Sequence, residues 1–171
     1  MPVTSDIAAT YRRPGTVVAE HLARGVSEPR ALAFLFGACV LMFIAQWPGI
    51  ARNAHLSNPD FVGNADTGLQ AALAGALFST VMILPLILYG VAALTQAFAW
   101  VIRRPIDGYA ARLALFWALL ASSPLALLNG LVEGFIGVGL ELTLVGALWF
   151  GAFLWFWISG LRAARAAEEA A

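Results

Sequence analysis

The chain has 171 residues, of which 61% are hydrophobic and only 12% are charged, and its formal net charge is zero. Soluble domains are roughly 45–50% apolar and about 25% charged. The composition therefore excludes a water-soluble domain and predicts that a lipid bilayer is the solvent. The balanced charge gives no field that would attract nucleic acid. The one cysteine, Cys39, excludes an intramolecular disulfide and a zinc site made of cysteines.

Residues 1–30 form the first predicted element, an N-terminal arm on the cytoplasmic side. Thr16 is the candidate N-cap of a short amphipathic helix through Val17, Val18 and His21, and Gly25 is the candidate end of that helix. Two interpretations of the arm stay open. Its helix lies on anionic lipid at the membrane surface through its apolar face, or it belongs to a partly ordered tether.

Four long apolar runs follow the arm. A helix needs about 20 apolar residues to cross the ~30 Å hydrocarbon core. The runs that reach this length are residues 31–50, 69–102, 113–132 and 142–161. They predict an all-α fold, a polytopic transmembrane helical bundle over residues 31–161, with a short cytoplasmic tail over residues 162–171.

The second run is too long for a single upright crossing, because one helix over residues 69–102 would measure roughly 50 Å. It is interpreted as one long helix, kinked at Pro85, or as two short spans, which would give the bundle five spans. The single helix is favoured because a turn inside lipid would expose backbone polar groups at several kcal/mol each.

The arginines give the predicted orientation, since the chain contains no lysine. With four spans, only Arg52 falls on the outer side. Cytoplasmic loops are enriched in basic residues, so both termini are predicted in the cytoplasm. Arginine without lysine, together with many alanines, is typical of a high-GC bacterial genome, which indicates the bacterial inner (cytoplasmic) membrane. The arginines on the predicted cytoplasmic side are Arg12, Arg13, Arg24, Arg30, Arg103, Arg104, Arg112, Arg162 and Arg165.

Catalytic chemistry is not predicted. Ionisable groups inside a membrane are costly and mark pumps and intramembrane enzymes, and the predicted hydrocarbon segments contain none. Glu133 and Glu141 fall at the outer rim. The histidines, His21 and His55, fall on opposite sides and cannot share a metal. We therefore expect no enzyme, no catalytic residue, no cofactor and no metal site.

Uncharged polar residues in the spans suggest one candidate site. Pro85 and Pro124 each remove a helix hydrogen bond and free a carbonyl one turn back. A backbone carbonyl that lacks its hydrogen bond inside the membrane must be buried in protein or line a water-filled cavity. Ser122, Ser123 and Asn129 lie close to Pro124 in the sequence. A polar cavity or kink at these five residues is one hypothesis, and simple interhelical hydrogen bonding is the other.

Small residues at four-residue spacing mark the predicted packing faces, among them Ala71, Gly75 and Ser79 on the second helix. Gly130 and Gly134 have the same spacing at the outer end of the third span, and two more glycines follow them. That glycine-rich stretch is interpreted as a flexible turn and not as a dimer face.

The second half of the chain contains a characteristic order of short motifs. In this order the chain resembles the Yip family, the Ypt/Rab-interacting membrane proteins, in its bacterial branch, best over residues 108–161. The resemblance implies an all-helical, multi-pass domain with a cytoplasmic arm and no enzymatic activity. Eukaryotic members of the family act in vesicle traffic by binding small GTPases and one another. The family usually has five spans, whereas four are predicted here. The motifs are Gly108-Tyr109, Arg112-Leu113-Ala114-Leu115, Ser122-Ser123-Pro124, a glycine-bearing turn and Gly160-Leu161.

Two kinds of function fit these observations. The first is a non-enzymatic Yip-like bundle that organises protein partners or lipids, with the bilayer and a protein partner or a second copy as its contacts. The alternative is a small oligomeric transporter or channel with a pore near Pro85, Pro124 and Asn129, or an accessory subunit of a larger membrane complex. Nucleic acid is not an expected partner.

Overall fold

The computed structural model describes residues 3–57, 65–101, 103 and 106–169, and within them every regular element is helical. This confirms the predicted all-α class. Two short helices precede five longer α-helices and one short π-helix. The elements are α1 (Val3–Thr10), α2 (Pro14–Ala23), α3 (Glu28–Ser57), α4 (Ala65–Phe78), η1 (Ser79–Ile83), α5 (Leu84–Val101), α6 (Gly108–Phe135) and α7 (Leu140–Glu169).

Four helices of the described chain are long and apolar enough to cross a membrane. They are Glu28–Leu56, Gly68–Val101, Gly108–Phe135 and Leu140–Glu168. Three of them contain a predicted span whole, and the second covers the predicted span 69–102 as far as Val101, so the prediction of four helices that can span a membrane is confirmed. Helix α7 also continues through most of the segment that was predicted as a separate tail.

The second span is one continuous helix because its backbone hydrogen bonding changes register before Pro85 and does not stop there. The N–H of Leu84 donates to the carbonyl of Ser79, five residues back, which is the π-helical pattern of η1. Pro85 has no N–H, and a π-turn beside a proline is a common way for a long helix to absorb the missing bond. The long α4–η1–α5 helix therefore needs no turn inside the membrane.

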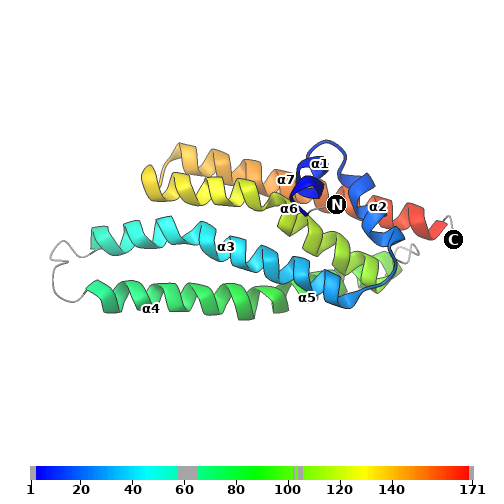
Figure 1. Cartoon of the computed structure of the whole chain (residues 1–171), viewed down its shortest axis with the longest axis horizontal. Coiled ribbons are helices and arrows are strands. Elements are labelled where there is room, and N and C mark those ends of the chain that lie inside the picture. Colours follow the sequence, from blue (N-terminus) through cyan, green and yellow to red (C-terminus); the bar gives the residue numbers. More distant parts are fainter. Residues whose placement is uncertain (1–2, 58–64, 102, 104–105, 170–171) are drawn as a thin grey trace.

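Figure 1 shows the bundle as an elongated stack, with α3 lying beside α4–α5 and α6 lying beside α7. Helix α6 is central, since it packs extensively against α3 and α7 and also touches α5 and the arm. In its most apolar stretch 61% of the residues are buried, against 11% for Gly68–Val101 and for α7. Both chain ends lie at the same end of the bundle, as an even number of spans requires.

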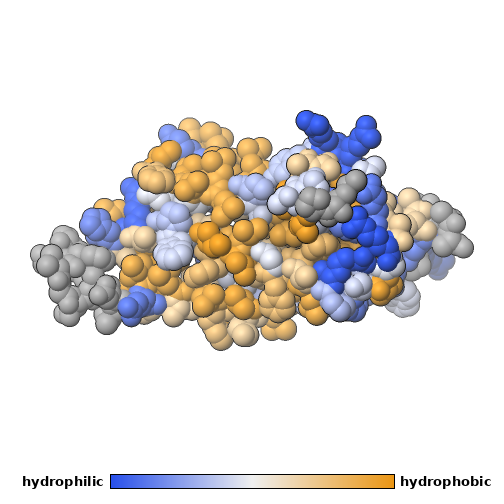
Figure 2. Space-filling view, in the orientation of Figure 1, coloured by the Kyte–Doolittle hydropathy of each residue, from blue (hydrophilic) through white to orange (hydrophobic). Residues whose placement is uncertain are grey.

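The surface has the distribution of a membrane protein. Figure 2 shows a broad hydrophobic belt around the middle of the bundle, with hydrophilic residues gathered toward its ends and most densely around α1 and α2. Large apolar side chains on the membrane-spanning helices are exposed, including Leu86, 74% exposed, and Phe98, 66% exposed. Such a continuous apolar surface is stable in lipid and would aggregate in water.

The N-terminal arm packs on the bundle. Helix α2 begins at Pro14, where a proline ring fits the first turn, so the N-cap position is Arg13 and not Thr16. Gly25, at a φ of +83°, follows the end of the helix as expected. The apolar face of α2 is buried against α6 and α7, so the arm is neither a loose tether nor a helix that gives this face to lipid.

Gly130 and Gly134 lie inside α6, so the interpretation as a turn is wrong for these two, whereas Gly137 and Gly139 do lie in the connection between α6 and α7. A Cβ on Gly130 would overlap the carbonyl oxygen of Ala45, and one on Gly134 would lie 3.1 Å from the carbonyl carbon of Pro48. The two glycines are therefore the points where α6 and α3 approach backbone to backbone, which is the usual role of this spacing in membranes.

Candidate functional site

The structure places the five predicted site residues in two different settings. Ser122 and Ser123 are buried in the centre of α6, with no more than 1% of either residue exposed. Their hydroxyls donate to the carbonyls of Leu119, at 3.0 Å, and Leu120, at 2.7 Å. The carbonyl of Leu120 is the one that Pro124 deprives of its helix bond, because it lies four residues back. Ser123 therefore satisfies the backbone group that Pro124 frees, within α6 itself.

Asn129 belongs to a different setting, a cavity of about 340 Å³. This cavity lies among α3, η1, the start of α5, α6 and α7, and neither Ser122 nor Ser123 lines it. Pro85 follows Leu84, which does line it. The lining residues are Met42, Ala45, Gln46, Ser79, Thr80, Leu84, Leu119, Ala126, Asn129, Gly130, Glu133 and Trp149. We call this space the outer cavity, because these residues fall in the half of the bundle that contains Arg52.

One pair of polar groups in the outer cavity is satisfied by the protein. Nε2 of Gln46 donates to Oγ1 of Thr80 at 2.9 Å, and that hydroxyl donates in turn to the carbonyl of Ala76 at 2.7 Å. The bond joins α3 to η1, so the π-turn is held by a side chain of the neighbouring helix. Interhelical bonds of this kind contribute on the order of 0.6 kcal/mol.

Two other polar groups of the cavity have no such partner. Oδ1 of Asn129 and Nε1 of Trp149 are buried, and neither has a hydrogen-bond partner among the described residues. Asn129 comes from α6 and Trp149 from α7, and both residues line the cavity. Oδ1 of Asn129 lies against α7, 3.3 Å from the position that a Cβ on Gly146 would take. An unmade bond costs a buried group about 1–3 kcal/mol.

Glu133 adds a carboxylate to the same wall. It lies one helical turn beyond Asn129, so both side chains share a face of α6. Its carboxyl lies over Gly49 of α3, where a Cβ would be only 2.6 Å from Oε1. Arg52 donates to the backbone carbonyl of Glu133, at 3.4 Å. Among the described residues, Arg112 and Glu28 form an ion pair and His21 contacts Asp6, and neither pair includes the carboxylate of Glu133.

A second polar cluster joins the arm to the bundle, and reasoning from the sequence missed it, apart from placing His21 on the apolar face of the arm helix. Nε1 of Trp117 in α6 donates to Oγ1 of Thr10 at 3.1 Å, and this hydroxyl donates to the carbonyl of Asp6 at 2.7 Å. Nε2 of His21 lies 3.7 Å from Oδ2 of Asp6. The imidazole also packs on the Trp117 ring, at 4.5 Å between centroids. We call Asp6, Thr10, His21 and Trp117 the arm cluster.

The imidazole of the arm cluster is neutral at neutral pH. Burial, which is the largest cause, and the nearby charge of Arg24 together lower the pKa of His21 from 6.5 to about 4, while Asp6 opposes the change. Nη1 of Arg24 lies 3.5 Å from Nδ1 of the imidazole. Since arginine has no acceptor, Nδ1 accepts and the proton is on Nε2, facing Asp6. A neutral, buried histidine thus helps to hold the arm against the bundle.

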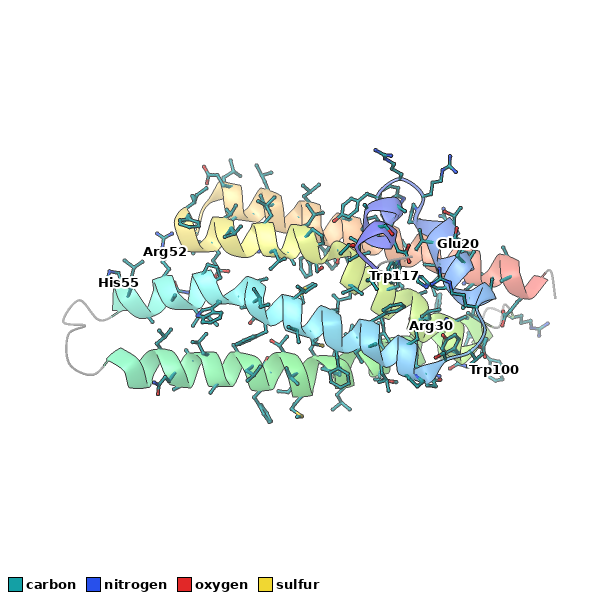
Figure 3. All side chains as sticks on the ribbon, in the orientation of Figure 1. Glu20, Arg30, Arg52, His55, Trp100 and Trp117 are labelled. Carbon is teal, nitrogen blue, oxygen red and sulfur yellow. The ribbon has the colours of Figure 1, made fainter. Side chains whose placement is uncertain are left out.

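The predicted arginines lie mainly where the arm and the starts of α3 and α6 meet. Arg30 donates to the carbonyl of Gly25 and to the hydroxyl of Tyr109, the latter at 3.1 Å, while Arg112 pairs with Glu28 at 2.5 Å. Figure 3 shows Arg30 and Trp100 at one end of the bundle and Arg52 and His55 at the other. Arg104 lies outside the described residues.

Within the described part of the chain, no group of three or more His, Cys, Asp or Glu side chains lies close enough together to hold a metal ion. The comparisons with models of protein families, with curated proteins and with solved structures find no match to this chain.

Proposed function

We propose that this chain is a non-enzymatic, multi-pass protein of the Yip-like type in the bacterial inner membrane, where it organises a protein partner and the surrounding lipid. The observation that carries the proposal is the unequal burial of the four spans. Helix α6 is enclosed, whereas only 11% of the most apolar stretch of Gly68–Val101 is buried. Because this long helix packs against the bundle along one side, most of its surface is available to another molecule.

The exposed face of α4–η1–α5 favours a protein partner. Gly75 and Gly90 have open space where a Cβ would be, and Ala71 and Ser79 are also exposed. Small residues at this spacing let a second helix approach closely, and van der Waals packing drives helix association in lipid. The exposed face of α7 carries bulky side chains instead, including Phe150 and Trp155, which suits it to lipid tails.

The proposed orientation has both termini and the arm in the cytoplasm. Its support is the gathering of arginines at the end of the bundle that carries the arm, with Arg52 at the opposite end (Figure 3). Basic residues are retained on the cytoplasmic side of bacterial membranes. The arm cluster would then lie on the cytoplasmic side and the outer cavity toward the periplasm.

The test is extraction of the protein from native membranes in a lipid-retaining polymer, without detergent, followed by mass spectrometry of everything retained. We expect a stoichiometric protein partner, or a second copy of the chain. Gly75→Leu should abolish its retention, because the added side chain would hold the helices apart. Gly151→Leu is the matched control, since Gly151 is equally open but lies on α7. Retention of no protein by the wild type, or equal retention by both variants, would contradict the proposal. Substrate turnover that is lost on point changes in the bundle would also contradict it.

The second candidate function is a small oligomeric carrier, and the outer cavity is the observation that favours it. We expect an oligomer to be needed, because four helices of this composition are too few to line an aqueous path within one subunit. Asn129→Leu replaces the unpartnered amide with an apolar side chain and should change flux in reconstituted liposomes. Unchanged flux would argue against a path through this cavity.

A further inference from the structure

We propose that the outer cavity is a binding site for an amphipathic amine, a molecule with a cationic ammonium group and an apolar body of limited size. Binding there would require no protein partner.

The charge of the site selects a cation. Among the described residues that line the cavity, Glu133 is the charged one and none is basic. The guanidinium of Arg52 donates to the backbone carbonyl of Glu133, and the described residues include no ion pair with the carboxylate. A carboxylate at the edge of a membrane-spanning bundle is unfavourable, and an ammonium group bound beside it would lower that cost.

The hydrogen-bonding groups select an ammonium rather than a quaternary cation. Oδ1 of Asn129 is a buried acceptor without a partner, one helical turn from Glu133 on the same face of α6. An ammonium group has N–H donors for a carboxylate oxygen, which a quaternary cation lacks, and bonds that involve an ionised group are the stronger ones. Trp149 lines the cavity from α7, and its Nε1 is a buried donor without a partner among the described residues.

The rest of the lining selects an apolar body. Met42, Leu84, Leu119 and Ala126 are apolar, and Gln46 and Thr80 already bond to each other. At roughly 30 Å³ per small group, a cavity of 340 Å³ holds about ten non-hydrogen atoms. A free organic amine of this size fits the cavity entirely. An aminated lipid headgroup would place its amine there and leave its chains in the bilayer.

The test is calorimetric titration of the full chain with octylamine, in nanodiscs of phosphatidylcholine, against empty nanodiscs. We expect saturable binding at one site per chain. Octanoate, which has the same apolar length and the opposite charge, should not bind. Glu133→Gln should weaken octylamine binding at least about tenfold, the loss that follows from one charged hydrogen bond, and Asn129→Leu should weaken it as well. Glu141→Gln is the matched control, because Glu141 is an exposed outer carboxylate that does not line the cavity.

Mass spectrometry of lipid retained through purification separates the two sources of the amine. Retention of phosphatidylethanolamine by the wild type but not by Glu133→Gln assigns the site to a lipid headgroup. Saturable octylamine binding without such retention assigns it to a free amine. Equal uptake of octylamine by empty nanodiscs and by both glutamate variants would overturn the proposal, as would equal binding of octanoate. Circular dichroism of each variant shows whether the helices are intact.

Discussion

Substitution of Gly130 by alanine tests the packing at the centre of the bundle. The added Cβ would overlap the carbonyl oxygen of Ala45 and lie 2.7 Å from its carbonyl carbon. Both are backbone atoms of α3, so no side chain can rotate away, and the two helices must separate. Overpacking of this kind costs roughly 1–3 kcal/mol and sometimes more. The cost is partly offset by the gain of about 1 kcal/mol when alanine replaces glycine in a helix. Because the overlapped atoms are backbone, we take the cost at the upper end of its range, about 3 kcal/mol, and expect a net loss of about 2 kcal/mol.

The matched control is Gly151→Ala. Gly151 also lies inside a membrane-spanning helix, but no atom lies within 4 Å of the position that its Cβ would take. This substitution should leave stability unchanged or raise it by up to about 1 kcal/mol. Reversible unfolding in mixed micelles with increasing SDS, followed by circular dichroism, measures both variants. Equal stability of Gly130→Ala and the wild type would refute the backbone contact between α3 and α6.

Two further predictions concern single polar groups. Acidification should release the arm. The pKa of His21 is 6.5 when the side chain is free and about 4 when it is buried. As the pH falls below 6.5, His21 is therefore protonated in the undocked arm before it is protonated in the docked arm, and docking weakens. The loss reaches about 2 kcal/mol at pH 5, and hydrogen exchange of α1 and α2 should quicken accordingly. A His21→Gln variant with the same pH dependence would show that another group is responsible. Ser123→Ala should cost about 1–3 kcal/mol, because it leaves the carbonyl of Leu120 without a partner beside Pro124. Ser122→Ala should cost clearly less in the same SDS titration, since the carbonyl that Ser122 contacts keeps its helix bond, and equal losses would refute this account of the serines.

The spans could be predicted because hydropathy depends on local composition alone. The continuity of the second helix also followed from a local argument, the cost of exposed backbone in lipid, although the π-turn at Ser79–Ile83 did not. Gly130 was misinterpreted because a glycine serves equally in a turn and at a close helix crossing. Only the neighbouring helix, through Ala45, decides between the two.

The polar groups show the same limit. His21 could be placed on the apolar face of α2 from its spacing, but its neighbour Trp117 is far away in the sequence and carries no local signal. Asn129 was predicted as part of a cavity on the strength of a nearby proline. Its actual companions, Glu133 and Trp149, are brought to the cavity by the pitch of α6 and by the packing of α7.

The orientation of the bundle is the central claim, because it decides which side the arm and the outer cavity face. Single cysteines at Val26, Ser57, Arg103 and Val138, in a Cys39→Ala background, can be labelled in intact spheroplasts with a maleimide that does not cross the membrane. We predict that Ser57 and Val138 are labelled in intact spheroplasts, and that Val26 and Arg103 are labelled only after lysis. Labelling of Val26 or Arg103 from outside, or protection of Ser57 and Val138, would contradict the proposed topology.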